Sequence, residues 1–484
     1  MLSYKNSRAL NLRMKNKTTD SLQFGEGNFL RAFVDFCLQT LNEKTSFSGK
    51  VNIVQPLPNG MIEQLKNQNG KYHLFQEGVM AGENIRLGQQ INCIDQMINP
   101  YQEFSNFLKL AENENLTFVF SNTTEAGIML DHEDQFNNTP ALSFPGKLTQ
   151  LLYHRYKTFS GDHSKILHII PCELIEKNGD KLKEIILELC DIWQLDENFQ
   201  SWIQQNHFYN TLVDRIVPGF PKNDVEFYQK NLPFDDQLIV TCEPFFLWVI
   251  EGNTKLLDIF PVDQLKNIDV KIVPDLGVYR TRKVRILNGS HTTLVPVGLL
   301  NGTSTVSESL KDNFLKTFLF QTLFDEIIPS VDFDKKELEN YAHSVLERFS
   351  NPFIIHQLES ISLNSISKFK VRVLPSLLSY FKKEGKVPKN LTFAMAALIY
   401  FYGKEVSKHT HSIKDDPKNI TFFNQLWKDN NIEKVVLEAL SNTALWGQNL
   451  AQISPLKDSL TQALNTIISQ DKISDAHRIF QNLQ

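Results

Sequence analysis

The segment Leu116-Thr-Phe-Val-Phe120 constrains the fold of this chain most, because four of its five residues are apolar. A strand that is apolar on both faces has to be covered on both faces, which is typical of the inner strands of a parallel sheet. Ile166-Leu-His-Ile-Ile170 has a similar composition, and Val51-Asn-Ile-Val54 reads as a shorter strand that ends before Pro56. We therefore expect a parallel sheet that is enclosed by helices.

Amphipathic helical patterns lie between these strands, for example over residues 31–41 and 181–193. Strands that alternate with such helices predict βαβ units and a doubly wound, Rossmann-type α/β domain. After about residue 277 strand-like runs become sparse, and long helical patterns follow at 314–328, 336–348 and 391–401. The chain is thus expected to divide into a Rossmann-type domain over residues 1–276 and a mainly α-helical domain over residues 277–484.

Charge and cysteine usage narrow the class of partner. The 484 residues carry a formal net charge of -5 without a basic stripe, which argues against a nucleic-acid partner. The five cysteines form no CxxC pair, which fits a reducing cytoplasm, and no apolar run approaches the length of a membrane span. We expect a cytoplasmic protein with a small-molecule partner and no membrane contact, while the oligomeric state is left open.

The pattern Gly25-Glu-Gly27 stands between a short apolar stretch and a helical pattern, where a dinucleotide fold needs close backbone approach to a pyrophosphate. Position 30 is Leu, so the third glycine of the usual fingerprint is missing, and a plain turn would also explain the pattern. Arg31 could add a positive charge near the phosphates. Gln55 follows the second strand, where an acid usually binds the ribose hydroxyls. A glutamine can hydrogen-bond a diol and offers no charge to a 2′-phosphate, so NAD is favoured over NADP.

Two further segments carry polar groups suited to a ligand. Ser121-Asn-Thr-Thr-Glu125 follows a buried strand at its carboxyl end, where ligands bind in open α/β sheets, although a simple Asx or Ser/Thr turn explains it equally well. Lys283, Asn288 and His291 would lie at about 0°, 140° and 80° around a regular α-helix. An ammonium, an amide and an imidazole gathered in this way suit the polarisation and protonation of a carbonyl. A solvated helix face would explain Lys283 alone, but the apolar residues 294–300 that follow favour a functional site.

Taken in order, these motifs resemble the mannitol dehydrogenase family of polyol-specific, long-chain NAD(P) oxidoreductases. Phe24-Gly-Glu-Gly-Asn-Phe-Leu-Arg31 is similar to the nucleotide loop of that family, and Lys283-x4-Asn288-x2-His291 to its catalytic signature. Further similar segments, which extend the resemblance over nearly the whole chain, are Ser121–Glu125, Phe144–Lys147, Asn178-Gly179, Val213–Arg215 and Arg348–Pro352. The resemblance implies cofactor-binding residues at Phe24, Gly25, Gly27, Asn28, Phe29, Arg31, Gln55, Ser121, Thr124 and Glu125.

The segments 171–176 and 242–251 are more similar to family members that act on sugar acids, and Cys172-Glu-Leu174 stands where mannitol-type members usually show Cys-Asp-Asn. This implies a reversible, metal-independent reduction of tagaturonate to altronate with NADH. Lys283 would then be the proton donor, Asn288 and Asn178 would stabilise the carbonyl oxygen, and His291 would orient them. The substrate would be bound by Lys368, Asp214, His356 and Arg372, with Lys368 as the first choice for its carboxylate, although a solvated charge at a helix end would explain Lys368 equally well.

Two alternatives stay open at the level of the sequence. The first is a dehydrogenase of fructuronate or of a mannitol-type polyol. The second is a catalytically silent protein that binds NAD(H) as a sensor, against which the intact set of Lys283, Asn288 and His291 argues.

Overall fold

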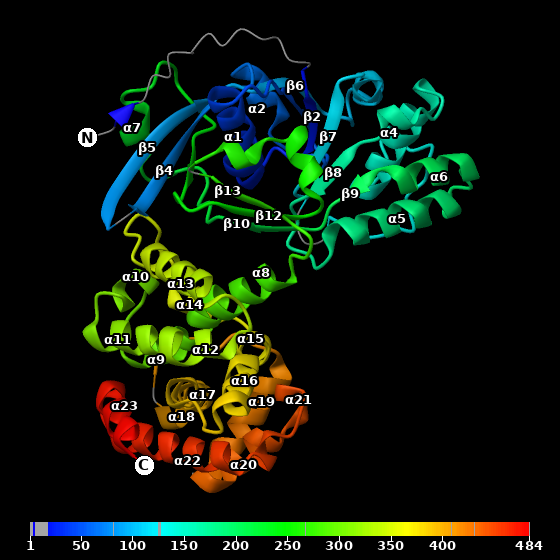
Figure 1. The fold of residues 1–484 in the computed structure, drawn as a ribbon. Helices are drawn as coiled ribbons and strands as arrows, with labels where there is room; N and C mark the ends of the chain where they lie inside the picture. The colour runs from blue at the N-terminus through cyan, green and yellow to red at the C-terminus, as the bar shows by residue number, and fades with distance from the viewer. Residues whose placement is uncertain are drawn as a thin grey trace. The chain divides into compact units, whose positions relative to one another are not determined.

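The computed structural model describes residues 3–4, 18–80, 82–123, 127–266, 268–407, 409–429 and 431–483. Two compact units meet in the sequence between Leu276 and Gly277. Unit 1 contains the strands, and the regular elements among the described residues of unit 2 are helices (Figure 1).

The centre of unit 1 is a six-stranded sheet in which all neighbouring strands are parallel. Counted along the chain within this sheet, the strand order is 3-2-1-4-5-6, which is the Rossmann arrangement. The winding direction reverses between the first and fourth of these strands, and ligands bind at such a switch point. The strands in spatial order are β6 (Ile94–Ile98), β3 (Val51–Val54), β2 (Asp20–Phe24), β7 (Leu116–Ser121), β8 (His168–Pro171) and β9 (His207–Phe208). The predicted doubly wound fold is confirmed.

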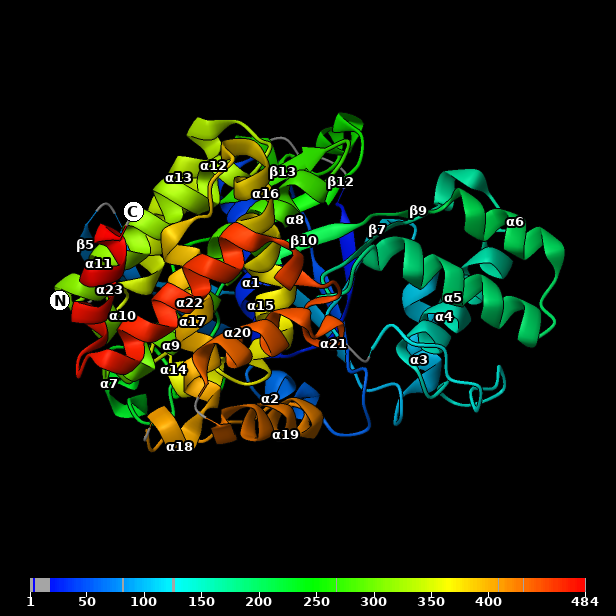
Figure 2. The ribbon, with the colours of Figure 1, turned by 90° about the horizontal axis from the view of Figure 1, so that it is seen from below.

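Both faces of this sheet are buried, as the apolar composition of its strands requires. Phe118 and Phe120 of β7 belong to a core that includes most of α1, whereas Leu116 and Val119 belong to a core formed with α3 to α6. In two views, α4, α5 and α6 lie together beside β9 (Figures 1 and 2), and Figure 1 also shows β8 next to them. The helices of unit 1 are α1 (Asn28–Lys44), α2 (Ile62–Asn67), α3 (Phe104–Lys109), α4 (Phe144–Thr158), α5 (Asn178–Ile192), α6 (Glu197–Gln205) and α7 (Val225–Gln229), with short 3-10 turns η1 (Leu110–Glu112), η2 (His163–Lys165), η3 (Thr254–Asp258) and η4 (Val262–Gln264).

Two smaller sheets in unit 1 were not predicted. One has the order β1-β5-β4-β11 and contains a long antiparallel hairpin, and the other has the order β10-β12-β13. Their strands are β1 (Ser3–Tyr4), β4 (Tyr72–Met80), β5 (Glu83–Ile91), β10 (Thr211–Asp214), β11 (Val240–Cys242), β12 (Leu247–Glu251) and β13 (Asp269–Val273). The side chains of β5 are mostly exposed or half-buried, so this strand lacks the apolar pattern from which the other strands were predicted.

Unit 2 is assembled around α17 (Lys389–Tyr402), which is buried almost all round and packs on α9 and α22. A helix that is apolar on every face has to lie in the interior, which explains this central position. The other helices are α8 (Gly277–Arg282), α9 (Gly289–Leu300), α10 (Val306–Ser309), α11 (Asn313–Gln321), α12 (Ile328–Ser330), α13 (Lys335–Phe349), α14 (Leu358–Ile361), α15 (Ser365–Arg372), α16 (Leu374–Glu384), α18 (Lys404–Ser407), α19 (Pro417–Leu426), α20 (Ile432–Ser441), α21 (Thr443–Trp446), α22 (Ser454–Ser469) and α23 (Ile473–Asn482), with π-helical segments η5 (Lys283–Asn288) and η6 (Thr322–Ile327) and 3-10 turns η7 (Trp427–Asp429) and η8 (Leu450–Gln452).

In the described ranges, none of the helices combines the length and the apolarity that a membrane crossing requires.

Candidate functional site

The loop between β2 and α1 has the geometry of a phosphate-binding turn. Gly25 has a φ of 122°, a value that side chains disfavour, and a Cβ there would lie 3.1 Å from the carbonyl oxygen of Asn122. Gly27 is the N-cap of α1, and a Cβ there would meet no atom within 4 Å among the described residues. Within the described residues, the space beside Gly27 at the N-terminus of this long helix is therefore open, as the pyrophosphate of a dinucleotide requires.

The other predicted residues of this loop contribute in different ways. The side chain of Phe24 is buried between Phe107 and Phe144, so only its backbone can face a ligand. Asn28 is half-buried, and its Oδ1 accepts a hydrogen bond from Arg31 Nη2 at 2.7 Å. Phe29, also half-buried, stacks on Phe33 in the same helix.

Arg31 is fully buried and its guanidinium is engaged within the protein. Nε donates to the carbonyl of Glu26 at 3.1 Å, and Nη1 donates to the carbonyl of Leu238. The guanidinium also lies 5.0 Å from the ring centroid of Tyr72. A direct bond from Arg31 to a phosphate would require some of these contacts to break. The guanidinium can therefore favour a bound anion through its charge, without touching it.

The side chain of Gln55 is turned into the loop that follows β3. Its Nε2 donates to the carbonyls of Leu57 at 2.8 Å and Pro58 at 3.1 Å, and its Oε1 accepts from the backbone of Ile62 at 3.4 Å. Gln55 is only 2% exposed. Its amide therefore stabilises the turn, and the predicted hydrogen bond to a ribose hydroxyl would compete with these bonds.

A buried glutamate that sequence reasoning missed holds the loop after β7. Glu173 accepts hydrogen bonds from the hydroxyl of Ser121 and from the backbone and hydroxyl of Thr123, each at 3.0 Å. Burial raises the pKa of Glu173, and these hydrogen bonds oppose the rise. Thr124 and Glu125, also predicted to bind the cofactor, lie outside the described residues. In the sequence, the sign of this role was that Cys172-Glu-Leu174 differs from the Cys-Asp-Asn segment usual in mannitol-type members.

Asn178, predicted to stabilise the substrate oxygen, begins α5 and is fully buried. Its Nδ2 lies 3.0 to 3.1 Å from the carbonyls of Pro171 and Glu173 and from the hydroxyl of Thr211. Its Oδ1 accepts from the backbone of Gly179 at 3.0 Å and of Thr211 at 2.8 Å. This amide has no donor left over for a substrate, which argues for a role in joining β8, α5 and β10.

Asp214 ends β10 and is buried, at 4% exposure. The neighbouring Arg215 donates to the carbonyls of Glu243 and Ala32 and to the side chain of Gln76, and so it ties α1 to two of the sheets. The role of Asp214 in substrate binding stays a prediction.

In unit 2 the predicted catalytic segment is helical, but it is not a regular α-helix. Lys283–Asn288 forms a π-helical turn between α8 and α9, and the backbone N–H of Gly289 donates to the carbonyl of Val284, five residues earlier. The α-helical angles expected for Lys283 and Asn288 are therefore wrong. In a π-helix, hydrogen bonds join residues five apart, so Lys283 and Asn288 lie about one turn apart on the same face. Such segments occur frequently at functional sites.

The three predicted groups differ in their surroundings. Lys283 and Asn288 are half-buried, whereas His291 is only 7% exposed. The backbone carbonyl of Asn288 accepts from the hydroxyl of Thr292 at 2.8 Å, but its side-chain amide has no hydrogen-bond partner within the described residues. That amide is thus available to a ligand.

The ring of His291 lies between two other rings. It stacks on Phe349 at the end of α13, with 4.1 Å between centroids, and meets His356 edge-on at 4.8 Å. Burial lowers the pKa of His356, which favours its neutral form. The structure therefore brings His356, predicted from the sequence, next to His291 and adds Phe349, which the sequence marked only as part of the family-like segment Arg348–Pro352.

Helix α15 carries the two predicted cations and packs on α9. A Cβ at Gly289 would lie 3.2 Å from the carbonyl oxygen of Arg372, so this glycine permits the close approach of the end of α15. The Nζ of Lys368 donates to the carbonyl of Ile361 at 2.8 Å, and its pKa is lowered by burial and then by the charge of Arg372. The half-buried guanidinium of Arg372 has no partner within the described residues, and burial lowers its pKa. Of the two cations, Arg372 therefore has fewer side-chain hydrogen bonds within the described residues.

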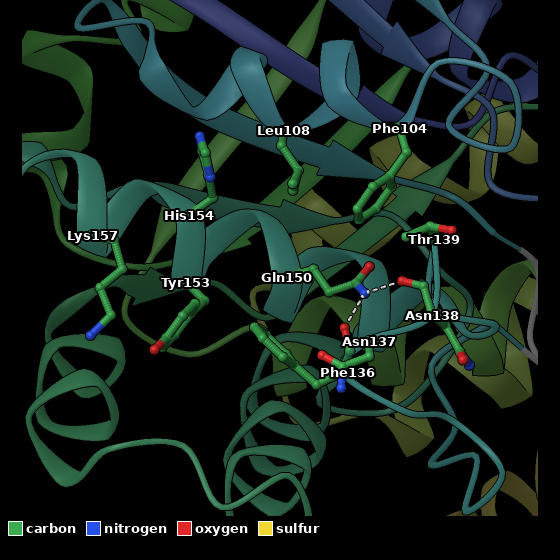
Figure 3. A pocket seen from close by; sticks show the side chains of 10 residues that line it. All are labelled: Phe104, Leu108, Phe136, Asn137, Asn138, Thr139, Gln150, Tyr153, His154 and Lys157. Carbon is green, nitrogen blue, oxygen red and sulfur yellow. Dashed lines mark hydrogen bonds between the residues drawn. The ribbon is translucent and has the colours of Figure 1, made fainter.

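A pocket of about 320 Å³ lies in unit 1 against α3 and α4 (Figure 3). Gln150, in its wall, donates to the carbonyls of Phe136 and Asn138 at 2.8 Å each. No residue predicted for the cofactor or the substrate lines this pocket, so it is not assigned to the site. Its lining residues are Phe104, Leu108, Phe136, Asn137, Asn138, Thr139, Gln150, Tyr153, His154 and Lys157.

Comparison with known proteins agrees with this architecture. The chain matches the mannitol dehydrogenase Rossmann domain over residues 19–259 and the mannitol dehydrogenase C-terminal domain over residues 275–468. Altronate oxidoreductases of Phocaeicola vulgatus and Bacillus subtilis are each 43% identical to it over 449 residues, which is 92% of this chain and 94% and 92% of theirs.

Two solved structures share the fold. A Pseudomonas fluorescens mannitol 2-dehydrogenase, in a ternary complex with NAD and D-mannitol, has a TM-score of 0.65 at 18% identity and covers 97% of this chain and 95% of its own. A substrate-free D-sorbitol dehydrogenase has a TM-score of 0.77 at 20% identity and covers 95% of this chain and 97% of its own.

The chain belongs to the mannitol dehydrogenase family, as its motifs implied. It is an oxidoreductase that acts on CH–OH groups, and its Rossmann domain is of the kind that takes a nicotinamide cofactor. The space beside Gly27 at the N-terminus of α1, which is open within the described residues, fits that cofactor.

Proposed function

We propose that this protein reduces tagaturonate to altronate with NADH, reversibly and without a metal ion. The substrate is supported by the altronate oxidoreductases, which are 43% identical to this chain over 92% of its length. The chemistry is supported by one observation above all. The half-buried amide of Asn288 has no partner within the described residues and lies about one π-turn from Lys283.

The bound nicotinamide would supply a hydride to the ketone carbon. Lys283 would donate a proton from Nζ to the carbonyl oxygen, so that the ketone becomes a secondary alcohol. The side-chain N–H of Asn288 would donate to the same oxygen, where negative charge develops. His291, held between Phe349 and His356, would orient the substrate oxygen and Lys283. Asn178 is not included, since its amide is fully used within unit 1.

The substrate carboxylate would be bound from α15. Arg372 offers a guanidinium without a partner in the described residues, and Lys368 lies one helical turn before it. An ion pair in a half-buried place contributes more than one on the surface. His356 and Asp214 would bind substrate hydroxyls.

The preference for NADH is supported by the turn after β3. Residues 55–65 contain no lysine or arginine, so this turn offers no cation to a 2′-phosphate. Lys66, which follows, already pairs with Glu103 at 2.5 Å and Glu63 at 3.6 Å.

The test is a panel of tagaturonate, fructuronate and fructose with NADH and NADPH, followed at the nicotinamide absorbance with and without EDTA. We expect the highest kcat/KM with tagaturonate and NADH, and no effect of EDTA. Faster reduction of fructuronate or fructose would instead support the fructuronate or polyol alternatives. Binding of NADH without turnover of any sugar would support the silent sensor.

A further inference from the structure

The end of β3 lacks the acid that Rossmann domains usually place there. In that position a carboxylate accepts hydrogen bonds from the ribose of the adenosine half. Here the residue is Gln55, whose amide is occupied by the carbonyls of Leu57 and Pro58. Some other group therefore has to accept the hydrogen bonds of the ribose hydroxyls.

The side chain of Glu26 reaches this place from the glycine loop. Its Oε1 accepts a hydrogen bond from the backbone of Met61 at 3.2 Å, in the turn that follows β3. A Cβ at Gly60 would lie 2.1 Å from that Oε1 and 2.5 Å from Cδ of Gln55. Gly60 thus leaves room for the carboxylate beside Gln55, between the turn and the loop in front of α1.

This carboxylate is nearly buried and lacks an ion pair in the part of the chain that the structure describes. Glu26 is 7% exposed, and burial raises its pKa above the ordinary value. Arg31 donates to the backbone carbonyl of Glu26, and its charge favours the ionised carboxylate only weakly compared with the cost of burial. Buried carboxylates are normally paired or fully hydrogen-bonded, whereas within the described residues Glu26 is held only by the backbone N–H groups of Met61 and of Glu26 itself, so it can accept a further donor.

We propose that Glu26 accepts the hydrogen bond of the adenosine ribose 2′-hydroxyl and thereby selects NAD against NADP. Its carboxylate would take the place of the acid that is absent at position 55. A 2′-phosphate would meet this negative charge in a turn without any lysine or arginine over residues 55–65. The inference rests on the proposed NADH preference, but it is independent of the sugar substrate.

The test uses ADP-ribose and its 2′-phosphate, whose binding is measured by calorimetry and needs no sugar. Wild-type protein is expected to bind ADP-ribose more tightly than the phosphorylated form. Glu26→Gln keeps an oxygen for the N–H of Met61 but removes the charge. It should reduce the ratio of the two affinities by at least about 10-fold, since a hydrogen bond to a charged group contributes about 1.5–3 kcal/mol.

Glu184→Gln is the matched control. It removes one negative charge from α5, where the Glu184 side chain is 65% exposed, and should leave the affinity ratio unchanged. If Glu26 only stabilises the turn, Glu26→Gln will lower the melting temperature or weaken both ligands equally. An unchanged ratio in Glu26→Gln would therefore overturn the proposal.

A second measurement uses the wild-type protein alone, so it does not depend on the folding of a variant. ADP-ribose should bind at least about 10-fold more tightly than its 2′-deoxy analogue, because the analogue leaves a buried acceptor without a donor. Equal affinities would reject the 2′-hydroxyl contact. Loss of tagaturonate reduction with this ligand preference intact would instead count against the proposed function alone.

Discussion

The imidazole of His291 stacks on the phenyl ring of Phe349, with 4.1 Å between the centroids and 15° between the ring planes. Both residues are buried, and His356 closes another edge of the imidazole at 4.8 Å. Ring packing between α9, the end of α13 and the segment that follows α13 therefore restricts the orientation of His291.

The first prediction concerns this stacking. Phe349→Leu removes the flat surface and should lower kcat about 10-fold with a smaller change in KM, because His291 would no longer hold one orientation. Phe349→Tyr keeps the aromatic ring and should retain most of the wild-type activity. Both quantities are measured at saturating NADH with tagaturonate.

Phe318→Leu provides the control for lost packing. Phe318 is fully buried in α11 and touches Phe393 and His477, so its loss should destabilise unit 2 without changing kcat per folded molecule. Equal effects of the two leucine variants on kcat would mean that Phe349 acts through stability alone.

The second prediction is that Lys283→Ala lowers kcat/KM at least about 10²-fold, as the loss of a general acid does. Binding of NADH, measured by fluorescence, should survive because the predicted cofactor loop belongs to unit 1. Lys335→Ala, at a 78% exposed side chain at the start of α13, should behave like wild type. Turnover of Lys283→Ala within a few-fold of wild type would remove Lys283 from the chemistry.

Three strands of the Rossmann sheet, β3, β7 and β8, could be predicted because burial leaves an apolar run in each. Val51–Val54 was predicted with its observed bounds, and Leu116–Phe120 differs from β7 by one residue. The hairpin of β4 and β5 could not be predicted in this way, because β5 is half-buried and its composition is mixed.

The sequence was enough to name candidate residues for the site, but not to predict the directions in which their side chains point. The π-turn of Lys283–Asn288 leaves the apolar pattern of the helix almost unchanged, so the sequence gives no sign of it. Gln55 and Asn178 stand at plausible positions, yet their amides turn into the protein to satisfy backbone groups. Such choices depend on contacts between distant segments, such as the one between Glu26 and Met61.

The third prediction concerns Asp35, which is fully buried in α1 and accepts a hydrogen bond from the hydroxyl of Tyr72 at 3.0 Å. Burial raises the pKa of Asp35 to about 7. An unfolded chain releases this proton near pH 3.9, so between about pH 4 and 7 the folded protein binds more protons. The free energy of unfolding should therefore fall as the pH rises through this window, by up to about 1.4 kcal/mol per pH unit.

Asp35→Asn removes this titration. Urea unfolding at about pH 5 and about pH 6.5 should show a smaller fall in stability for the variant than for wild type. Asp95→Asn, at a surface aspartate that pairs with Lys50, should follow the wild-type dependence. Parallel curves for wild type and Asp35→Asn would show that Asp35 is not the group that titrates.

The last prediction concerns the charge of the substrate. Arg372 has no partner in the described ranges, whereas Lys368 already donates to the carbonyl of Ile361 at 2.8 Å. Arg372→Gln should therefore raise KM for tagaturonate by about 10- to 100-fold, as expected for the loss of a charge-assisted hydrogen bond. Lys368→Met should have a smaller effect, because part of its role is to hold the turn that ends at Ile361. Any neutral ketose that reacts, such as fructose, serves as the internal control, and its KM should change little in either variant. Equal losses on the charged and the neutral substrate would reject the carboxylate contact, and a larger loss in Lys368→Met than in Arg372→Gln would assign that contact to Lys368 instead.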